Sequence, residues 1–297
     1  GAKTGLVNLN YQSAGTVNGV SNGLAAIGVG GQSVTVNGNV YQAATGQLVG
    51  NTFNFGTLQV GQQVSTDLAA RNIATGTAGY VEDLNVRFGA SGNGQISGSG
   101  SFTGIQAGAT SNAGNGTMTV TVNGTTVGAL NSSIAVNYFS AGTVAGVSNG
   151  LGELARGGEN FGVNGTINAV GNVINQASPQ FGTTSVNLGA VRVGAAAPTA
   201  NFQLTNQSVG GQQAALSATI ASNGAPVTAS GAVNLLAPGA SSSALQVGLN
   251  TAVAGNFTGG NAGSATVSLV SDASNVGNCG ANCTLNLASQ QITVQGK

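Results

Sequence analysis

One segment of the chain is used twice, and this internal repeat limits the possible folds more than any other feature. Residues 13–17 are identical to residues 140–144. At the same offset, Asn10-Tyr11 aligns with Asn137-Tyr138, Gly19–Leu24 with Gly146–Leu151, and Val36–Gly38 with Val163–Gly165. Repeats of this kind indicate that one structural unit is built more than once.

A weaker third copy ends the sequence, because SATVSLVSDASNVG and QQITVQGK follow the pattern of the repeated segment. The copies lie near residues 5–40, 132–168 and 264–297, and we call each copy a closing segment. The intervening residues repeat as well, since FGTLQVG matches LGAVRVG. This order predicts an N-terminal strand segment at 1–40 and two β-sandwich domains at 41–168 and 169–297. The first closing segment therefore has no domain of its own.

The closing segments have the pattern of β-strands. In the first copy, Val7, Leu9 and Tyr11 alternate with polar or small residues, and Val34, Val36 and Val40 do so after a glycine-rich connection. A period of two places alternate side chains on one sheet face. Asn-Gly beside alternating apolar residues predicts hairpins.

These patterns predict an all-β chain with two tandem immunoglobulin-like antiparallel β-sandwich domains, preceded by an orphan N-terminal strand pair. The segment STDLAARNIA at residues 65–74 could form a helix, but its aligned partner TANFQLTN alternates, so we predict a strand. A parallel β-solenoid is the main alternative. Solenoid repeats are about 20–50 residues long, and the closing segments lie much further apart.

The most complete copy of the repeated unit, at the C-terminal end, resembles a known family. TTSVNLGAVRVGAAAPTANFQLTNQS, SGAVNLLAPGASSSALQVGLN and LASQQITVQGK resemble bacterial choice-of-anchor D repeats, which are similar to the immunoglobulin-like modules of ASPM/SPD-2/Hydin type. The resemblance is clear over residues 178–297, fainter over 45–168, and reaches 5–40 only through the internal repeat. It implies a secreted or surface-exposed β-sandwich protein and implies no activity. We expect the sorting tail of typical members to be cleaved, absent or outside this sequence.

Charge is scarce, and this excludes several partners. Charged residues make up 4% of the chain and the formal net charge is zero, so a basic surface for nucleic acid or anionic lipid cannot form. No apolar run is long enough to insert into a membrane. A neutral surface favours self-association, which suits a secreted coat or fibre. Disorder is an alternative for so polar a chain, but 41% of the residues are hydrophobic. The chain begins at Gly1, and we interpret it as a processed, secreted form.

The residues needed for catalysis are few. The sequence has no histidine, so the usual general base is absent, and we expect no enzyme activity, no cofactor and no metal site. The acids, Glu82-Asp83 and Glu153 among them, are interpreted as solvated loop charges. Cys279 and Cys283 are predicted to form a disulfide that closes a short loop, because a zinc site would need further ligands.

The orphan segment leads to a functional hypothesis. A two-stranded hairpin alone is marginal in water, so Val7, Leu9, Tyr11, Val34, Val36 and Val40 need a partner surface. We expect these strands to dock on another copy of the chain and to polymerise head to tail into an extracellular filament, sheath or matrix. The alternatives are pairing at the edge of the C-terminal unit, a swap with the closing segment of that unit, packing on its own first domain, and a remnant of a longer repeat protein. A monomeric surface adhesin or carbohydrate-binding module is the second functional hypothesis, with glycans as partners.

Overall fold

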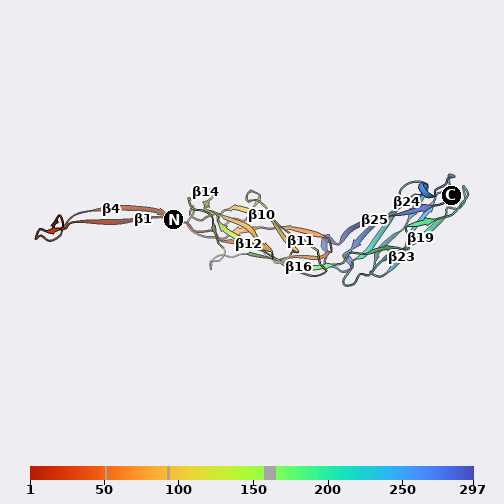
Figure 1. The fold of residues 1–297 in the computed structure, drawn as a ribbon, viewed down its shortest axis with the longest axis horizontal. Coiled ribbons are helices and arrows are strands. Elements are labelled where there is room, and N and C mark those ends of the chain that lie inside the picture. The colour runs from red at the N-terminus through yellow and green to blue at the C-terminus, as the bar shows by residue number, and fades with distance from the viewer. Residues whose placement is uncertain (51, 92–93, 157–164) are drawn as a thin grey trace.

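The computed structural model describes residues 1–50, 52–91, 94–156 and 165–297. The described chain is all-β, apart from short 3-10 turns. It is elongated, with the N-terminal hairpin, a first sandwich and a second sandwich arranged in a row (Figure 1). The predicted all-β class is confirmed.

The N-terminal hairpin consists of two long antiparallel strands, β1 (Ala2–Ser13) and β4 (Ile27–Asn39). Its tip carries a small second hairpin, β2 (Thr16–Val17) and β3 (Val20–Ser21). The tip points away from the rest of the molecule, while the N-terminus lies at the base, beside the first sandwich (Figure 1). The hairpin therefore does not fold back on its own first sandwich.

The first sandwich surrounds one hydrophobic core, in which Leu58, Val86, Val120 and Val136 are buried. Its main strands follow the order β6-β16-β12-β9-β10-β11-β7, and β5 pairs with β8. The strands are β5 (Gly46–Leu48), β6 (Thr52–Gln59), β7 (Gln63–Asp67), β8 (Ala70–Asn72), β9 (Leu84–Ser91), β10 (Ile96–Ile105), β11 (Met118–Asn123), β12 (Gly128–Ser140), β13 (Thr143–Val144), β14 (Val147–Ser148), β15 (Leu154–Ala155) and β16 (Gly165–Ile174), with a 3-10 turn, η1 (Ala113–Asn115).

The second sandwich surrounds a separate core that includes Phe202, Leu245, Val267 and Ile292. Its two sheets have the orders β17-β19-β23-β21 and β18-β25-β24-β20-β22. The strands are β17 (Pro179–Phe181), β18 (Ser185–Asn187), β19 (Thr199–Asn206), β20 (Ala215–Ser222), β21 (Val227–Ser230), β22 (Ala232–Leu236), β23 (Ser241–Leu249), β24 (Gly263–Asp272) and β25 (Thr284–Gln295), with turns η2 (Gly259–Asn261), η3 (Ala273–Asn275) and η4 (Gly280–Asn282).

Both sandwiches have the same strand order. In the second one, β17-β19-β23-β21 corresponds to the A-B-E-D sheet of an immunoglobulin-type sandwich, and β25-β24-β20 corresponds to G-F-C. In the first one, the single strand β10 takes the places of β21 and β22, since it pairs with β11 through residues 96–100 and with β9 through 101–105. Gly100 lies at this change of sheet with φ +85°, a conformation that favours glycine.

The alternation of buried and less buried residues along the strands explains how the hydrophobic cores form. Strand β12 alternates buried and less buried residues along most of its length, and β11 alternates throughout, so one face of each strand packs inward. The segment STDLAARNIA is extended rather than helical, as predicted, but it contributes to two strands, β7 and β8, and not to one. The predicted boundary at residue 168 falls inside β16, which belongs to the first sandwich. A boundary after Ile174 fits the strands better.

Candidate docking site on the N-terminal hairpin

The N-terminal hairpin corresponds to the last two strands of each sandwich, which we call the closing hairpins. In the first sandwich, β12 pairs with β9 and β16 pairs with β6. In the second, β24 pairs with β20 and β25 pairs with β18. Among the described residues, β1 and β4 pair only with each other. Both outer edges of the N-terminal hairpin are therefore free for strand addition.

The register of the N-terminal hairpin supports this correspondence. Val7 pairs with Val34 and Gly5 pairs with Val36. In the second sandwich, Ala265 pairs with Ile292 and Gly263 pairs with Val294, which are the residues that the repeat aligns with them. The first sandwich differs. The constant offset between the first two copies of the repeat predicts that Ile134 pairs with Phe161, but Ile134 pairs with Ile167. Phe161 lies outside the described residues.

One face of the N-terminal hairpin is apolar and exposed. Paired residues in an antiparallel sheet share a face, so Val7, Leu9, Tyr11, Val34 and Val36 form one surface, the apolar hairpin face. Tyr11 is 46% exposed, whereas its repeat partner Tyr138 is 2% exposed in the first sandwich. Full burial of each large apolar side chain contributes about 1.5–3 kcal/mol. The predicted residue Val40 is also exposed, but it lies just beyond β4.

The tip loop of the hairpin has the same backbone conformation as the loop after β12. Gly15, Asn18 and Gly19 have φ values of 66°, 49° and 78°, and the repeat partners Gly142, Ala145 and Gly146 have 68°, 48° and 80°. In both loops a backbone N–H donates across the loop to a glycine carbonyl, from Asn22 to Gly15 and from Asn149 to Gly142, at 3.0 Å.

Glycine is required at the start of this loop. A Cβ on Gly15 would collide with the carbonyl oxygen of Leu24, and a Cβ on Gly142 would collide with that of Leu151. The shared glycines and the shared hydrogen bonds explain why the repeat is most nearly identical here. The tip loop is therefore formed before any partner is present.

In the first sandwich this loop holds two buried carboxylates. Asp83 accepts hydrogen bonds from Thr143 Oγ1 at 2.7 Å, Gly146 N at 2.8 Å and Ala145 N at 3.1 Å. The neighbouring Glu82 accepts from Asn149 Nδ2 at 2.7 Å and from the hydroxyl of Ser140. Both acids are almost fully buried. Hydrogen bonds to a carboxylate are among the stronger polar contacts in proteins.

This arrangement corrects the interpretation of Glu82 and Asp83 as solvated loop charges. The two acids precede β9, where irregular backbone lets both side chains reach the loop. The repeat preserves the loop residues that bind the pair, but it does not indicate that Glu82 and Asp83 are the groups they bind. Glu153 is an exposed loop residue, as expected, and it forms an ion pair with Arg87.

The second sandwich has no acid pair at this place. Asn72 Nδ2 donates to the carbonyl oxygens of Glu82 and Ile105, and Asn206 Nδ2 donates to those of Ala214 and Leu236. This shared contact places Ala214 where the first sandwich has Glu82, and Ala215 follows in the place of Asp83. The facing loop differs too, because it contains the turn η3 in place of β13 and β14.

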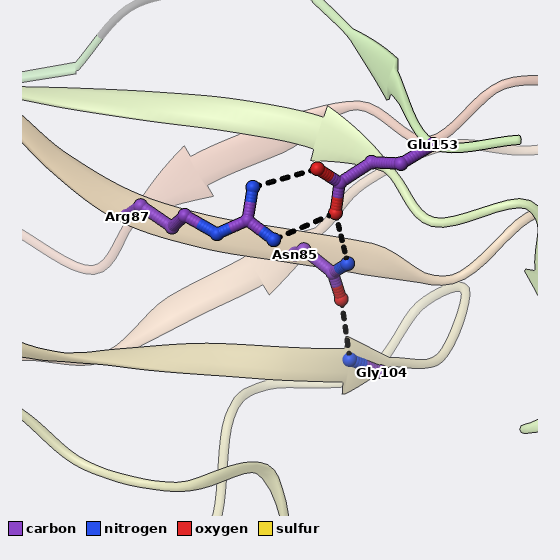
Figure 2. A network of polar contacts seen from close by, with 4 residues as sticks. All are labelled: Asn85, Arg87, Gly104 and Glu153. Atoms are coloured by element: carbon purple, nitrogen blue, oxygen red, sulfur yellow. Dashed lines mark hydrogen bonds and ion pairs between the residues drawn. The ribbon is translucent and has the colours of Figure 1, made fainter.

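A second polar contact fixes the loop of the first sandwich to β9 (Figure 2). Glu153 binds the guanidinium of Arg87 through both carboxylate oxygens, at 2.6 and 2.8 Å, and also accepts from Asn85 Nδ2 at 2.6 Å. Arg87 lies over the ring of Phe139, 4.6 Å from its centre. The hydrogen bonds from Arg87 lower the pKa of Glu153 below its usual value.

At the junction between the two sandwiches, a serine donates a hydrogen bond as Ser140 does to Glu82, but the acceptor is a different residue. Gln59 at the end of β6 is fully buried, and its side-chain oxygen accepts from the hydroxyl of Ser271. The repeat aligns Ser271 with Ser140, which donates to Glu82. Gln59 Nε2 also donates to the carbonyl oxygen of Cys283 at 2.9 Å. The first sandwich thus supplies the side chain that occupies the end of the second.

The predicted disulfide is present, since Cys279 and Cys283 are bonded. It closes the turn η4 at the junction, where Thr57 N donates to the carbonyl oxygen of Asn278 at 2.8 Å. Beside it lies an open groove of about 740 Å³, lined by Phe53, Phe55 and the disulfide turn. Its lining is mainly neutral polar and aromatic.

The described residues contain no group of three or more side chains that could hold a metal ion. Over the same residues, no helix is long and apolar enough to cross a membrane.

Comparisons with known proteins do not assign a family. No family model and no curated protein match the chain. A protein of unknown function from Porphyromonas gingivalis W83 is similar at 10% identity and a TM-score of 0.30, over 85% of this chain and 99% of that chain. The ASH/PapD-like domain 7 of human CEP192 is similar at 9% identity and a TM-score of 0.28, over 45% of this chain and 87% of that chain.

Domains 4 and 5 of the S-layer protein SbsC are similar at 12% identity and a TM-score of 0.24, over 55% of this chain and 64% of that chain. These scores are too low to carry an argument about function. The resemblance to choice-of-anchor D repeats therefore stays a prediction.

Proposed function

We propose that this protein is a structural subunit of an extracellular filament, sheath or matrix, and that the N-terminal hairpin joins it to a neighbouring subunit by β-strand addition. The observation that carries the proposal is the exposed apolar hairpin face. Its repeat partners are buried in the second sandwich, and those of Val7, Leu9 and Tyr11 are buried in the first. The chain behind the hairpin consists of two tandem immunoglobulin-like domains that act as a spacer. It has no catalytic role.

Three features support this function. Strands β1 and β4 present free edges along their length, which are templates for pairing with another chain. The surface has little charge to oppose association. The hairpin and the second sandwich lie at opposite ends of an elongated molecule (Figure 1). A contact between different ends is heterologous, so it propagates into an open polymer when the neighbour is another copy.

Negative-stain electron microscopy of the purified chain at several concentrations tests the proposal. We expect uniform fibres whose length increases with concentration. Deletion of residues 1–40 should leave two folded sandwiches that remain monomeric. A matched control exchanges Leu6 for threonine, because Leu6 is exposed and pairs with Thr35 on the face opposite the apolar hairpin face. Fibres formed equally well by the deletion variant would contradict the proposal.

A monomeric carbohydrate-binding adhesin is the second candidate. The groove beside the disulfide turn favours it, since Phe53 and Phe55 line a cavity large enough for a small sugar. Binding of the monomer on a glycan array, lost on exchange of both phenylalanines for serine, would support this function. A glycan array without binding, together with fibres in the microscope, would leave the structural role as the better explanation.

A further inference from the structure

The tip loop of the N-terminal hairpin contains every group with which the first sandwich binds Glu82 and Asp83. Ser13, Thr16 and Asn22 correspond to Ser140, Thr143 and Asn149, and the backbone N–H groups of Asn18 and Gly19 correspond to those of Ala145 and Gly146. All five residues are exposed in the hairpin. The loop has the bound conformation, as its φ values show.

The loop and the acid pair occur together within this chain. The first sandwich has both the loop and Glu82-Asp83, whereas the second has Ala214-Ala215 and a loop with other residues. Its loop instead meets Ala215 through Asn275, whose Oδ1 accepts from the backbone N–H of Ala215 at 3.1 Å. The two sandwiches can therefore be compared within one chain. In each of them, the loop of the closing hairpin forms hydrogen bonds with residues at or just before the start of the neighbouring strand.

We propose that the N-terminal hairpin closes an open β-sandwich in a neighbouring chain, one that lacks its own closing hairpin and presents a Glu-Asp pair just before the strand that β1 covers. This rests on the part of the proposed function that makes the hairpin a docking element. It names a different partner from the homopolymer, because both sandwiches of this chain already have their own closing hairpins. It adds the chemistry of the partner. A sandwich of the second type, with two alanines at this place, leaves the five donors of the loop without carboxylate acceptors.

The first sandwich gives the expected register. Ser140 pairs with Leu84 and Tyr138 pairs with Val86, so Ser13 and Tyr11 are expected to face the corresponding residues of the partner strand. The apolar hairpin face then covers the open core of the partner. The carboxylates of the pair reach the tip loop and fix the register, because a slip would separate them from the donors.

Differences between the two hairpins limit what else the partner needs. Phe139 and Glu153, which hold Arg87 in the first sandwich, align with Gln12 and Ala26. The N-terminal hairpin therefore cannot form the Arg87 contact of Figure 2. The partner strand needs the acid pair and does not need the arginine.

A peptide that reproduces the acid pair and its strand tests the inference. Residues 79–91 of this chain, GYVEDLNVRFGAS, contain Glu82, Asp83 and the strand β9. Titrated into the 15N-labelled full chain, this peptide should shift the amide signals of Asn18 and Gly19 and those of β1. The same peptide with Glu82→Ala and Asp83→Ala should bind about tenfold or more weakly, since several charge-assisted hydrogen bonds are lost.

Two hairpin variants make the result specific. Asn22→Asp keeps the side-chain oxygen that caps Leu24 but replaces the donor for the glutamate with a negative charge, so binding should weaken about tenfold or more. Val20→Thr is the matched control, because Val20 is exposed in the same loop and its repeat partner Val147 is exposed in the first sandwich. Its affinity should equal that of the natural chain.

A tethered form removes the concern that a free strand binds weakly. The register places the C-terminal end of the peptide opposite Val7, about 20 Å along the strand from Gly1. A linker of about 12 Gly/Ser residues spans this distance and gives a millimolar effective concentration. Unchanged amide signals in residues 16–24 of the tethered chain, or equal shifts with the alanine form, would overturn the inference.

The outcomes separate this inference from the proposed function. Fibres together with no response to the acid-bearing peptide would mean that the hairpin docks on another surface, so the inference fails while the proposed function stands. Peptide binding by a chain that forms no fibres supports the inference and contradicts homopolymerisation. Self-association that disappears with Glu82→Ala and Asp83→Ala in the full chain, while tyrosine fluorescence shows that the first sandwich is still folded, would indicate hairpin exchange between closed copies and would overturn the open partner.

Discussion

Replacement of Asp83 by alanine should destabilise the first sandwich and leave the second unaffected. Asp83 is 1% exposed, and its carboxylate accepts three hydrogen bonds from the loop after β12, one from a hydroxyl and two from backbone N–H groups. At about 1.5–3 kcal/mol for each bond to a charged group, the bonds lost sum to roughly 4.5–9 kcal/mol. Water can reach the part-buried donors, and the cost of burying the charge disappears. We therefore expect a loss of about 2–4 kcal/mol in the free energy of unfolding.

Urea unfolding followed by two probes measures this loss. The four tyrosines of the sequence all precede residue 139, so tyrosine fluorescence reports the first sandwich and the hairpin, whereas far-ultraviolet circular dichroism reports the whole chain. The fluorescence transition of Asp83→Ala should move to lower urea, and the later part of the dichroism curve should stay in place. The control is Asp67→Ala, which removes one exposed hydrogen bond from Thr119 and should change stability by less than about 0.5 kcal/mol.

A fluorescence transition for Asp83→Ala that differs from that of the natural chain by no more than the Asp67→Ala control would refute the reasoning. It would mean that water replaces the carboxylate at no cost. The loop would then not depend on the acid pair, and the repeated residues around it would need another explanation.

Three further predictions concern other contacts. Gln59→Ala should loosen the junction, because the bonds to Ser271 and Cys283 are lost, and small-angle X-ray scattering should show a broader distribution of distances between the sandwiches. Reduction of the disulfide should lower the stability of the second sandwich by about 2 kcal/mol, as expected for a short closed loop, measured by calorimetry with and without a reductant. The lowered pKa of Glu153 adds stability at neutral pH that is lost as the pH falls through the folded-state pKa, below the usual range for a glutamate. Because Glu153 and Arg87 are both partly exposed, this contribution is about 0.5–1 kcal/mol, and Glu153→Gln should remove that part of the pH dependence of unfolding.

The sequence alone predicted much of the secondary structure, because strand formation follows local patterns. Alternation at Val7, Leu9 and Tyr11 indicated a strand, and the aligned copies indicated which strands are equivalent. The spacing of Cys279 and Cys283 indicated a local disulfide. Each of these inferences depends on residues that are neighbours in the chain or on direct comparison between copies.

The remaining features depend on contacts between distant parts of the chain. The burial of Glu82 and Asp83 requires a loop about sixty residues later to supply its donors. The insertion of Gln59 into the second sandwich joins residues more than two hundred positions apart. The passage of β10 from one sheet to the other occurs near Gly100, where a Cβ would collide with the carbonyl oxygen of Thr117. No periodicity in the local sequence encodes such pairings.

The parallel pairing of the second strand with the last strand of each sandwich has a mechanical consequence. Strand β6 pairs in parallel with β16, from Thr52 with Asn168 to Gln59 with Ile174, and β18 pairs in parallel with β25 only from Ser185 to Asn187. Tension applied through the chain pulls the start of one strand and the end of the other in opposite directions, so the hydrogen bonds between them are sheared together. Resistance to force is a property of the unfolding rate, and it increases with the number of bonds sheared at once. The first sandwich is therefore the stronger link of the two, and the second should extend first under load.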